Sequence, residues 1–197
     1  MSKTQDIRDE ILLAALPNVA FDGWSWDMVC ESAVQAGHTE NVARAVFPSH
    51  LVDVLDHFAD WADRQMLEVL KDVDPEELRI RDRVRDAVLA RLTTLNPHKE
   101  AVRQSLQCWA WPTRNPRAAK ITWRTADCIW DWAGDTSDDY NRYTKRGLLS
   151  GVIASTTLAW LKDASEDMEQ TTAFLDRRIE NVMQLGKVVN RFKTKVS

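Results

Sequence analysis

Two histidines and two aspartates share one face of the segment that follows Pro48. His50, Asp53, His57 and Asp60 are separated by three, four and three residues, which aligns side chains on a helix. Histidine and carboxylate groups bind metals in many proteins. Di-iron helical bundles, however, use Glu-x-x-His pairs, and the sequence contains none. We therefore interpret the set as a solvated acidic helix face and predict neither a metal site nor a cofactor.

Other motifs of catalysis are missing from the sequence. It has no His-Glu-x-x-His, no Cys-x-x-Cys, no glycine-rich phosphate loop and no nucleophile elbow. Cys30, Cys108 and Cys128 are odd in number and widely spaced. This favours reduced cysteines in the core over disulfides or nucleophiles. We predict that the protein is not an enzyme.

Apolar residues recur at helical spacing along the chain, and no strand pattern appears. Glycine and proline number six each in 197 residues, which argues against a turn-rich β fold. We predict an all-α bundle of about nine helices in one unit, with a break or kink at Pro17. The expected helix starts are Ser25, Thr39, Pro48, Asp74, Asn96, residue 117, residue 140 and the region of Asp163.

The N-terminal helices resemble the helix-turn-helix domain of TetR regulators. The stretch from Ala36 to Ser49 has that family's Ala-Gly turn, nine intervening residues and Phe-Pro-Ser. The resemblance implies DNA binding by the third helix, but the charge contradicts it. Residues 1–78 carry 16 acidic and 5 basic residues, a net charge of −11, whereas DNA binding needs cations. Glu40 also stands where these regulators often carry lysine, so we expect no nucleic-acid binding.

The C-terminal half carries a second and more specific resemblance. Residues 123–130 (WRTADCIW), residues 133–146 (AGDTSDDYNRYTKR) and the earlier LPNVAFDGW at 16–24 are the motifs. They resemble the accessory-protein family of ubiquinone (coenzyme Q) biosynthesis, whose bacterial members are also labelled rpsU-divergently transcribed proteins. One departure is Arg142, which stands where mitochondrial members carry tryptophan.

The resemblance implies a TetR-like helical bundle without DNA binding. It also implies a lipid-binding protein that supports a di-iron demethoxyubiquinone hydroxylase. The ligand would be an isoprenoid lipid or quinone intermediate, and the location the cytoplasmic side of a bacterial inner membrane, with peripheral attachment. A ligand-responsive TetR-type regulator is the alternative. TetR-like folds usually pair through their last helices, so a homodimer is expected by analogy. We divide the chain into a degenerate helix-turn-helix part (1–72), a lipid-cavity part (73–184) and a basic tail (185–197).

Lipid contacts are expected from the uncharged stretch 147–161 and from the tryptophans near it. Its small residues would leave room for a ligand, although a buried central helix would look the same. The predicted lipid-binding residues are Trp123, Trp130, Leu149, Ile153 and Trp160.

Two surfaces are expected to meet other molecules. The hydroxylase would dock on Asp139, Tyr140, Arg142, Tyr143 and Arg146, which could instead form a solvated capping turn. An anionic membrane would meet the basic amphipathic tail, which could instead be a frayed soluble end. The predicted membrane residues are Lys187, Arg191, Phe192, Lys193 and Lys195.

Overall fold

The computed structural model describes residues 2–111, 113–137 and 140–196, without the side chains of 140 and 185–196. The described residues form nine α-helices, three short 3₁₀ helices and no strand, so the all-α prediction is confirmed. The α-helices are α1 (Lys3–Asp22), α2 (Trp26–Gln35), α3 (Glu40–Val46), α4 (Leu51–Val69), α5 (Ile80–Leu95), α6 (Lys99–Trp109), α7 (Asn115–Trp132), α8 (Tyr140–Lys162) and α9 (Glu169–Val196). The 3₁₀ helices are η1 (Pro75–Glu77), η2 (Asn96–His98) and η3 (Glu166–Met168).

Tertiary contacts divide the chain into two compact units. Unit 1 comprises Met1–Met66 and Thr93–Ile121, and unit 2 comprises Leu67–Leu92 and Thr122–Ser197. The boundaries follow contacts between helices, and they fall inside α4, α5 and α7. The sequence-based division at residues 72 and 184 remains a prediction.

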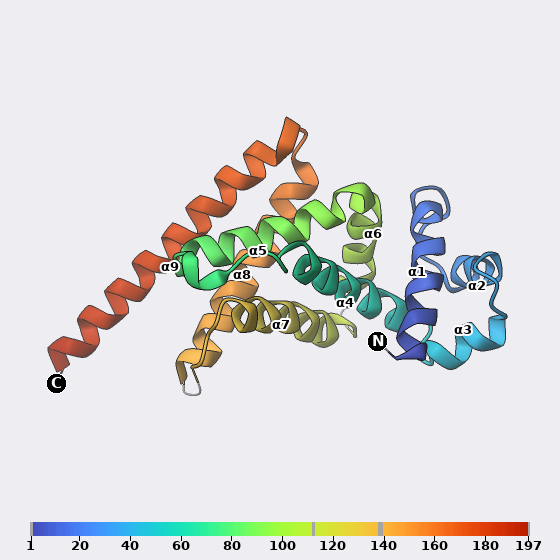
Figure 1. Cartoon of the computed structure of the whole chain (residues 1–197), viewed down its shortest axis with the longest axis horizontal. Coiled ribbons are helices and arrows are strands. Elements are labelled where there is room, and N and C mark those ends of the chain that lie inside the picture. Colours follow the sequence, from blue (N-terminus) through green and yellow to red (C-terminus); the bar gives the residue numbers. More distant parts are fainter. Residues whose placement is uncertain (1, 112, 138–139, 197) are drawn as a thin grey trace. The chain divides into compact units, whose positions relative to one another are not determined.

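In unit 1, α1, α2 and α3 pack together in the helix-turn-helix arrangement (Figure 1, blue). The two predicted N-caps are confirmed, because Ser25 and Thr39 each accept a hydrogen bond from the backbone three residues later. A break at Pro17 is wrong, since α1 continues to Asp22, whereas a kink there stays a prediction. Proline leaves the Leu13 carbonyl without its helical partner. Leu13 and Pro17 both lie on the solvent-exposed side of α1, where water can donate a hydrogen bond to the Leu13 carbonyl.

The solvated-face interpretation of the His–Asp set on α4 is wrong for one member. His57 is only 6% exposed, because α1 packs over it and Asp9 lies 2.7 Å from its Nε2. Arg64 also donates to both oxygens of Asp9, at 2.6 and 2.8 Å. Burial lowers the pKa of His57 more than Asp9 raises it. The imidazole is therefore neutral near pH 7 and links α1 to α4 as a structural group.

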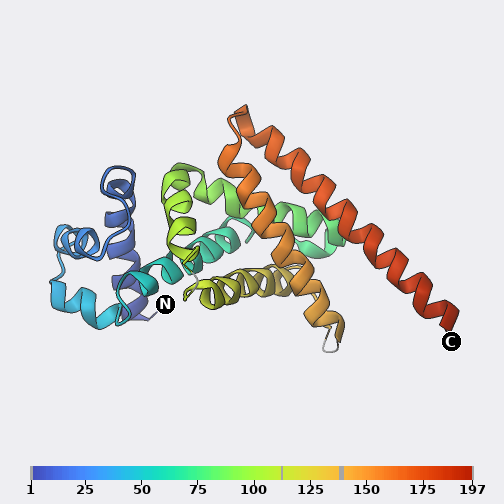
Figure 2. The same ribbon diagram turned by 180° about the vertical axis from the view of Figure 1, so that it is seen from behind.

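Unit 2 contains a third difference from the sequence-based expectation. The Asp74 side chain accepts a hydrogen bond from the backbone N–H of Glu76, as expected of a helix cap. Only the single turn η1 follows it, however, and α5 begins at Ile80. The rest of the unit contains the pair α8 and α9, which contact each other, meet at the turn that joins them and diverge from it in both ribbon views (Figures 1 and 2). Arg85 of α5 joins α9 through Asp176 at 2.8 Å. The predicted span of α8, 140–162, is confirmed.

No helix among the residues searched is both long and apolar enough to pass through a bilayer.

Candidate functional site

One side of α8 is buried in unit 2 and is mostly apolar. Leu149, Ile153 and Trp160 are 3%, 7% and 0% exposed, so the three predicted lipid contacts on this helix share its interior side. Val152 and Leu161 extend the same surface. The spacing of three and four residues places these side chains on one stripe.

The small residues of α8 lie mainly on its opposite side. Gly147, Gly151 and Ala154 are exposed, and a Cβ atom built on Gly151 would meet nothing within 4 Å. The sequence predicts that these residues leave room for a ligand beside the helix. In the structure they instead leave a smooth exposed strip, which Leu158 continues at 56% exposure.

The two predicted tryptophans of α7 are half-buried and contact the start of α8. The ring of Trp123 lies 6.2 Å from that of Tyr143. The ammonium of Lys145 lies 5.4 Å above the ring of Trp130, a favourable cation–π arrangement. The Nε1–H of Trp130 is buried and has no hydrogen-bond partner.

Arg146 is the most buried charge of this region, at 2% exposure. Its guanidinium binds three aspartates: Asp127, Asp131 at 3.1 Å and Asp135 at 3.0 Å. Burial would raise the pKa of Asp135, but hydrogen bonds from Lys145, Ser137 and Arg146 outweigh it and lower that pKa to about 2. The network ties the end of α7 to the start of α8.

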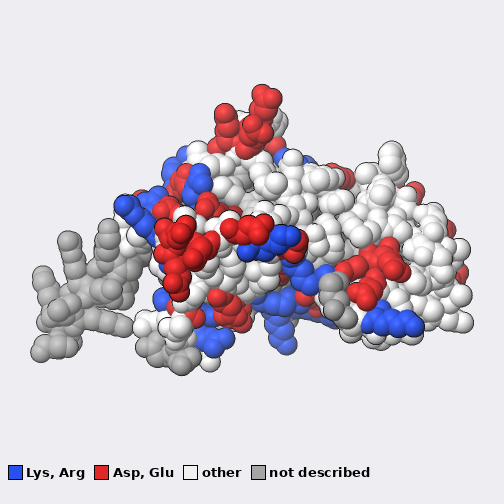
Figure 3. Space-filling view, viewed as in Figure 1, with Lys and Arg blue, Asp and Glu red and all other residues white. Residues whose placement is uncertain are grey.

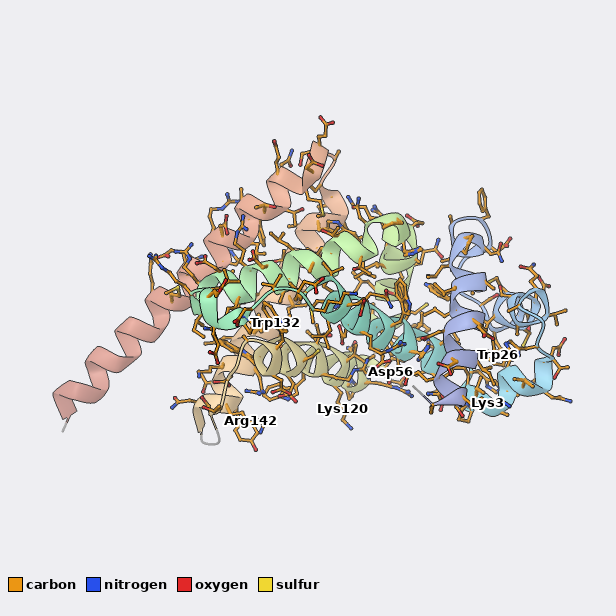
Figure 4. The ribbon with its side chains drawn as sticks, viewed as in Figure 1. Lys3, Trp26, Asp56, Lys120, Trp132 and Arg142 are labelled. Carbon is orange, nitrogen blue, oxygen red and sulfur yellow. The ribbon has the colours of Figure 1, made fainter. Side chains whose placement is uncertain are left out.

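The predicted docking residues therefore occupy different environments. Tyr143 is 64% exposed. Arg142, labelled near the start of α8 in Figure 4, is partly exposed and lies 3.4 Å from Asp127. Arg146 faces the interior, where it can position this surface but not touch a partner. Asp139 and the side chain of Tyr140 lie outside the described residues.

The predicted membrane residues lie in the part of α9 whose side chains are outside the described structure. The backbone of α9 runs to Val196, so these residues continue its helix. The side chains in question are those of Lys187, Arg191, Phe192, Lys193 and Lys195.

The sequence of this chain is similar to those of known proteins. Residues 115–186 match the COQ9 family model. The chain is 32% identical to the mitochondrial ubiquinone biosynthesis protein COQ9 of Rattus norvegicus, over 96% of this chain and 63% of the relative. It is 33% identical to COQ9-B of Xenopus laevis, over 92% of this chain and 64% of that protein. The chain is similar to the COQ9 proteins, and its residues 115–186 match their family model.

The COQ9 match covers every predicted lipid-binding and docking residue, from Trp123 to Trp160. The chain spans less than two thirds of the length of these curated relatives. A TetR transcriptional regulator from Nitrosomonas europaea has the same fold, with a TM-score of 0.71, 20% identity, and coverage of 89% of this chain and 97% of that one. The predicted TetR-like fold is thus confirmed.

Sequence reasoning missed the three aspartates that hold Arg146. Asp127, Asp131 and Asp135 recur every four residues, which places them along one side of α7 and the turn after it. That spacing could have predicted the network, because three carboxylates in one row repel each other unless a basic side chain lies between them. Among the described residues, no group of three or more His, Cys, Asp or Glu is arranged to hold a metal ion.

Proposed function

We propose that this protein is a non-catalytic, lipid-binding accessory protein of ubiquinone biosynthesis. It binds isoprenoid quinone precursors in unit 2 and presents them to a di-iron demethoxyubiquinone hydroxylase at the cytoplasmic side of a bacterial inner membrane. The observation that carries the proposal is the similarity to COQ9 proteins, which are named as ubiquinone biosynthesis proteins.

The interior of unit 2 supports lipid binding on physical grounds. Leu149, Ile153 and Trp160 offer a contiguous apolar surface. Burying an isoprenoid tail against such a surface gains about 0.8 kcal/mol for each CH2 group. An enzyme that acts on a nearly insoluble substrate gains from a partner that takes this lipid out of the membrane.

Lipid extraction tests the proposal directly. The full chain is purified under mild conditions, extracted with organic solvent and analysed by mass spectrometry. We expect isoprenoid quinones or their precursors in stoichiometric amounts, released only when the protein is denatured. A chain that carries no lipid and takes up none from vesicles containing ubiquinone would refute the proposal.

Docking of the hydroxylase is expected to depend on Tyr143. Tyr143→Ala should weaken hydroxylase binding by about 1–3 kcal/mol, because exposed tyrosines commonly anchor interfaces. The melting temperature should change little, since the side chain is 64% exposed. Pull-down and calorimetry measure the loss. Lys162→Ala, an exposed change at the other end of α8, is the matched control. Unchanged binding by Tyr143→Ala would move the interface elsewhere.

Membrane attachment is expected to depend on the basic tail. The double change Lys193→Gln and Lys195→Gln should weaken binding to anionic vesicles by about 2 kcal/mol, since each base near the surface contributes about 1 kcal/mol. Co-sedimentation at low salt measures this. A chain ending at Gln184 should lose the salt-sensitive binding altogether, and full binding by that chain would place the contact elsewhere.

A homodimer would use the exposed strip of α8. Small residues allow helix backbones to approach closely, and Gly151 has open space around it. Gly151→Leu should therefore convert the dimer to monomers without unfolding the chain, as measured by light scattering after size exclusion. Glu169→Leu, an exposed change outside the strip, is the control. A dimer that survives Gly151→Leu would exclude this surface.

The alternative is a ligand-responsive transcriptional regulator, which the TetR-like fold favours. Its recognition helix would be α3, where Arg44 is the single basic residue and lies 3.8 Å from Glu40. DNA affinity rises with the number of phosphates neutralised. A gel shift with genomic fragments at low salt separates the two functions, since specific retardation would favour the regulator.

A further inference from the structure

Three buried polar residues with different hydrogen bonding lie on the interior side of α8 or directly after its last residue. At one end, Arg146 binds three aspartates. At the other end, Asp163 accepts hydrogen bonds from Ser165 and Thr171. Between them, Thr156 is 0% exposed and its hydroxyl has no partner. Buried polar groups are nearly always paired, so an exception of this kind calls for an explanation.

Neighbouring hydroxyls show that a local partner is normally found on this helix. Ser150, Ser155 and Thr157 each donate to the carbonyl four residues earlier, at 2.8 Å. Thr156 could make the same bond to the carbonyl of Val152 by rotation about one side-chain bond. It does not. Thr156 is three residues from Ile153 and four from Trp160, so it lies on the same buried stripe of α8.

A second unsatisfied group lies in the same unit. The Nε1–H of Trp130 on α7 is buried and without a partner. An indole N–H can only donate, whereas a threonine hydroxyl can donate and accept. Both groups therefore suit a ligand oxygen that accepts hydrogen bonds.

We propose that the Thr156 hydroxyl hydrogen-bonds an oxygen of the bound lipid, so that the protein selects an oxygenated isoprenoid, such as a quinone or phenol, over an isoprenoid hydrocarbon. This rests on the proposed function, because it assigns the polar contact of the same lipid site. An unpaired hydroxyl destabilises the empty protein and becomes favourable only when the ligand is present.

The test uses a ubiquinone with a tail of two isoprene units as the probe. Quinones quench tryptophan fluorescence, so titration of the full chain gives the affinity, and displacement by squalene gives the affinity for a hydrocarbon. Thr156→Val keeps the shape and removes the hydroxyl. We expect it to weaken quinone binding by about 5–10-fold, the effect of one net hydrogen bond, and to leave squalene displacement unchanged.

Thr157→Val is the matched control, because its hydroxyl is already bonded to Ile153. It should change quinone affinity less than twofold. The melting temperature of the ligand-free protein supplies an independent readout. Thr156→Val should raise it, since an unpaired buried hydroxyl is removed, whereas Thr157→Val should not. Thr156→Ser, which keeps the hydroxyl, should retain quinone binding.

The outcomes separate this inference from the function on which it rests. If Thr156→Val binds the quinone as well as the unaltered protein does, the inference is wrong and lipid binding stands. A lower melting temperature of Thr156→Val would also overturn it, because the hydroxyl would then be bonded within the protein. If the unaltered protein binds neither probe, the proposed function fails and the inference fails with it.

Discussion

Replacing Arg146 with methionine is expected to lower the free energy of unfolding by about 3 kcal/mol. Methionine has nearly the same length, so the loss isolates the guanidinium. Arg146 is 2% exposed, and Asp135, one of its partners, is 4% exposed. Removing the cation leaves Asp135 buried with Lys145 as its remaining basic partner. Because Asp127 and Asp131 reach solvent, we place the cost at the lower end of the range for breaking a buried ion pair.

Arg142→Met is the matched control, one helical turn away. Its side chain is 42% exposed and lies 3.4 Å from Asp127, so its loss should cost less than about 1 kcal/mol. Urea unfolding followed by circular dichroism compares the two variants. Equal stability of Arg146→Met and the unaltered protein would mean that the network does not hold α7 to α8.

The same network predicts a pH dependence. The pKa of Asp135 is lowered to about 2 in the folded protein, whereas the ordinary value is about 3.9. The unfolded chain therefore binds a proton first as the pH falls. The stabilisation is complete above about pH 4 and is lost as the pH falls toward 2. Arg146→Met should have a shallower decline of stability over this window, measured by urea midpoints at each pH.

Arg146 and Tyr143 should affect hydroxylase binding in different ways. Because it is buried, Arg146→Met would weaken hydroxylase binding by disturbing the surface that contains Tyr143, and its melting temperature would fall as well. Tyr143→Ala should weaken the same binding with stability intact. Comparing affinity with stability for both variants separates a positioning residue from a contact residue.

Short-range patterns in the sequence predict the helix caps and the span of α8 correctly. Ser25 and Thr39 cap helices through bonds to residues three positions away, and such local chemistry depends little on the rest of the fold. The span of α8 followed in the same way from the polar turn before it and from Asp163 after it. Family motifs added the TetR-like arrangement, which helix periodicity alone would not have supplied.

Errors arose where tertiary packing decides the outcome. Arg142 and Arg146 lie four residues apart and look alike in sequence, yet one is partly exposed and the other buried. His57 was assigned to solvent because its partner Asp9 is 48 residues away, on a helix that packs over it. The unpaired hydroxyl of Thr156 was equally hidden, since Ser150, Ser155 and Thr157 are chemically similar neighbours with local partners.

Replacing Asp163 with alanine is expected to cost about 3 kcal/mol of unfolding free energy, because it leaves several buried donors unpaired. Asp163 is 8% exposed and accepts from the backbone N–H and the hydroxyl of Thr171, at 2.8 and 2.6 Å. Thr171 is itself 0% exposed and lies in the first turn of α9, where backbone N–H groups have no helical partner. Asp163 thus caps α9 from the end of α8.

Backbone strain makes this cap more necessary. Asp167 and Met168 have φ angles of 54° and 57°, in the left-handed region that non-glycine residues rarely occupy. The connection also gathers acidic side chains, seen at the top of Figure 3. The left-handed backbone opposes the turn, so the bonds to Asp163 must hold it.

Asp163→Asn distinguishes the charge from the hydrogen-bond geometry. It keeps one accepting oxygen and should cost about half as much as Asp163→Ala. Burial raises the pKa of Asp163, but the bonds from Ser165 and Thr171 outweigh this and hold it well below its usual value. Stability from this group is therefore present above about pH 4 and is lost only in strong acid. Hydrogen exchange of the first turn of α9 should accelerate in Asp163→Ala before global unfolding does. If exchange there is unchanged, the cap does not hold α8 against α9.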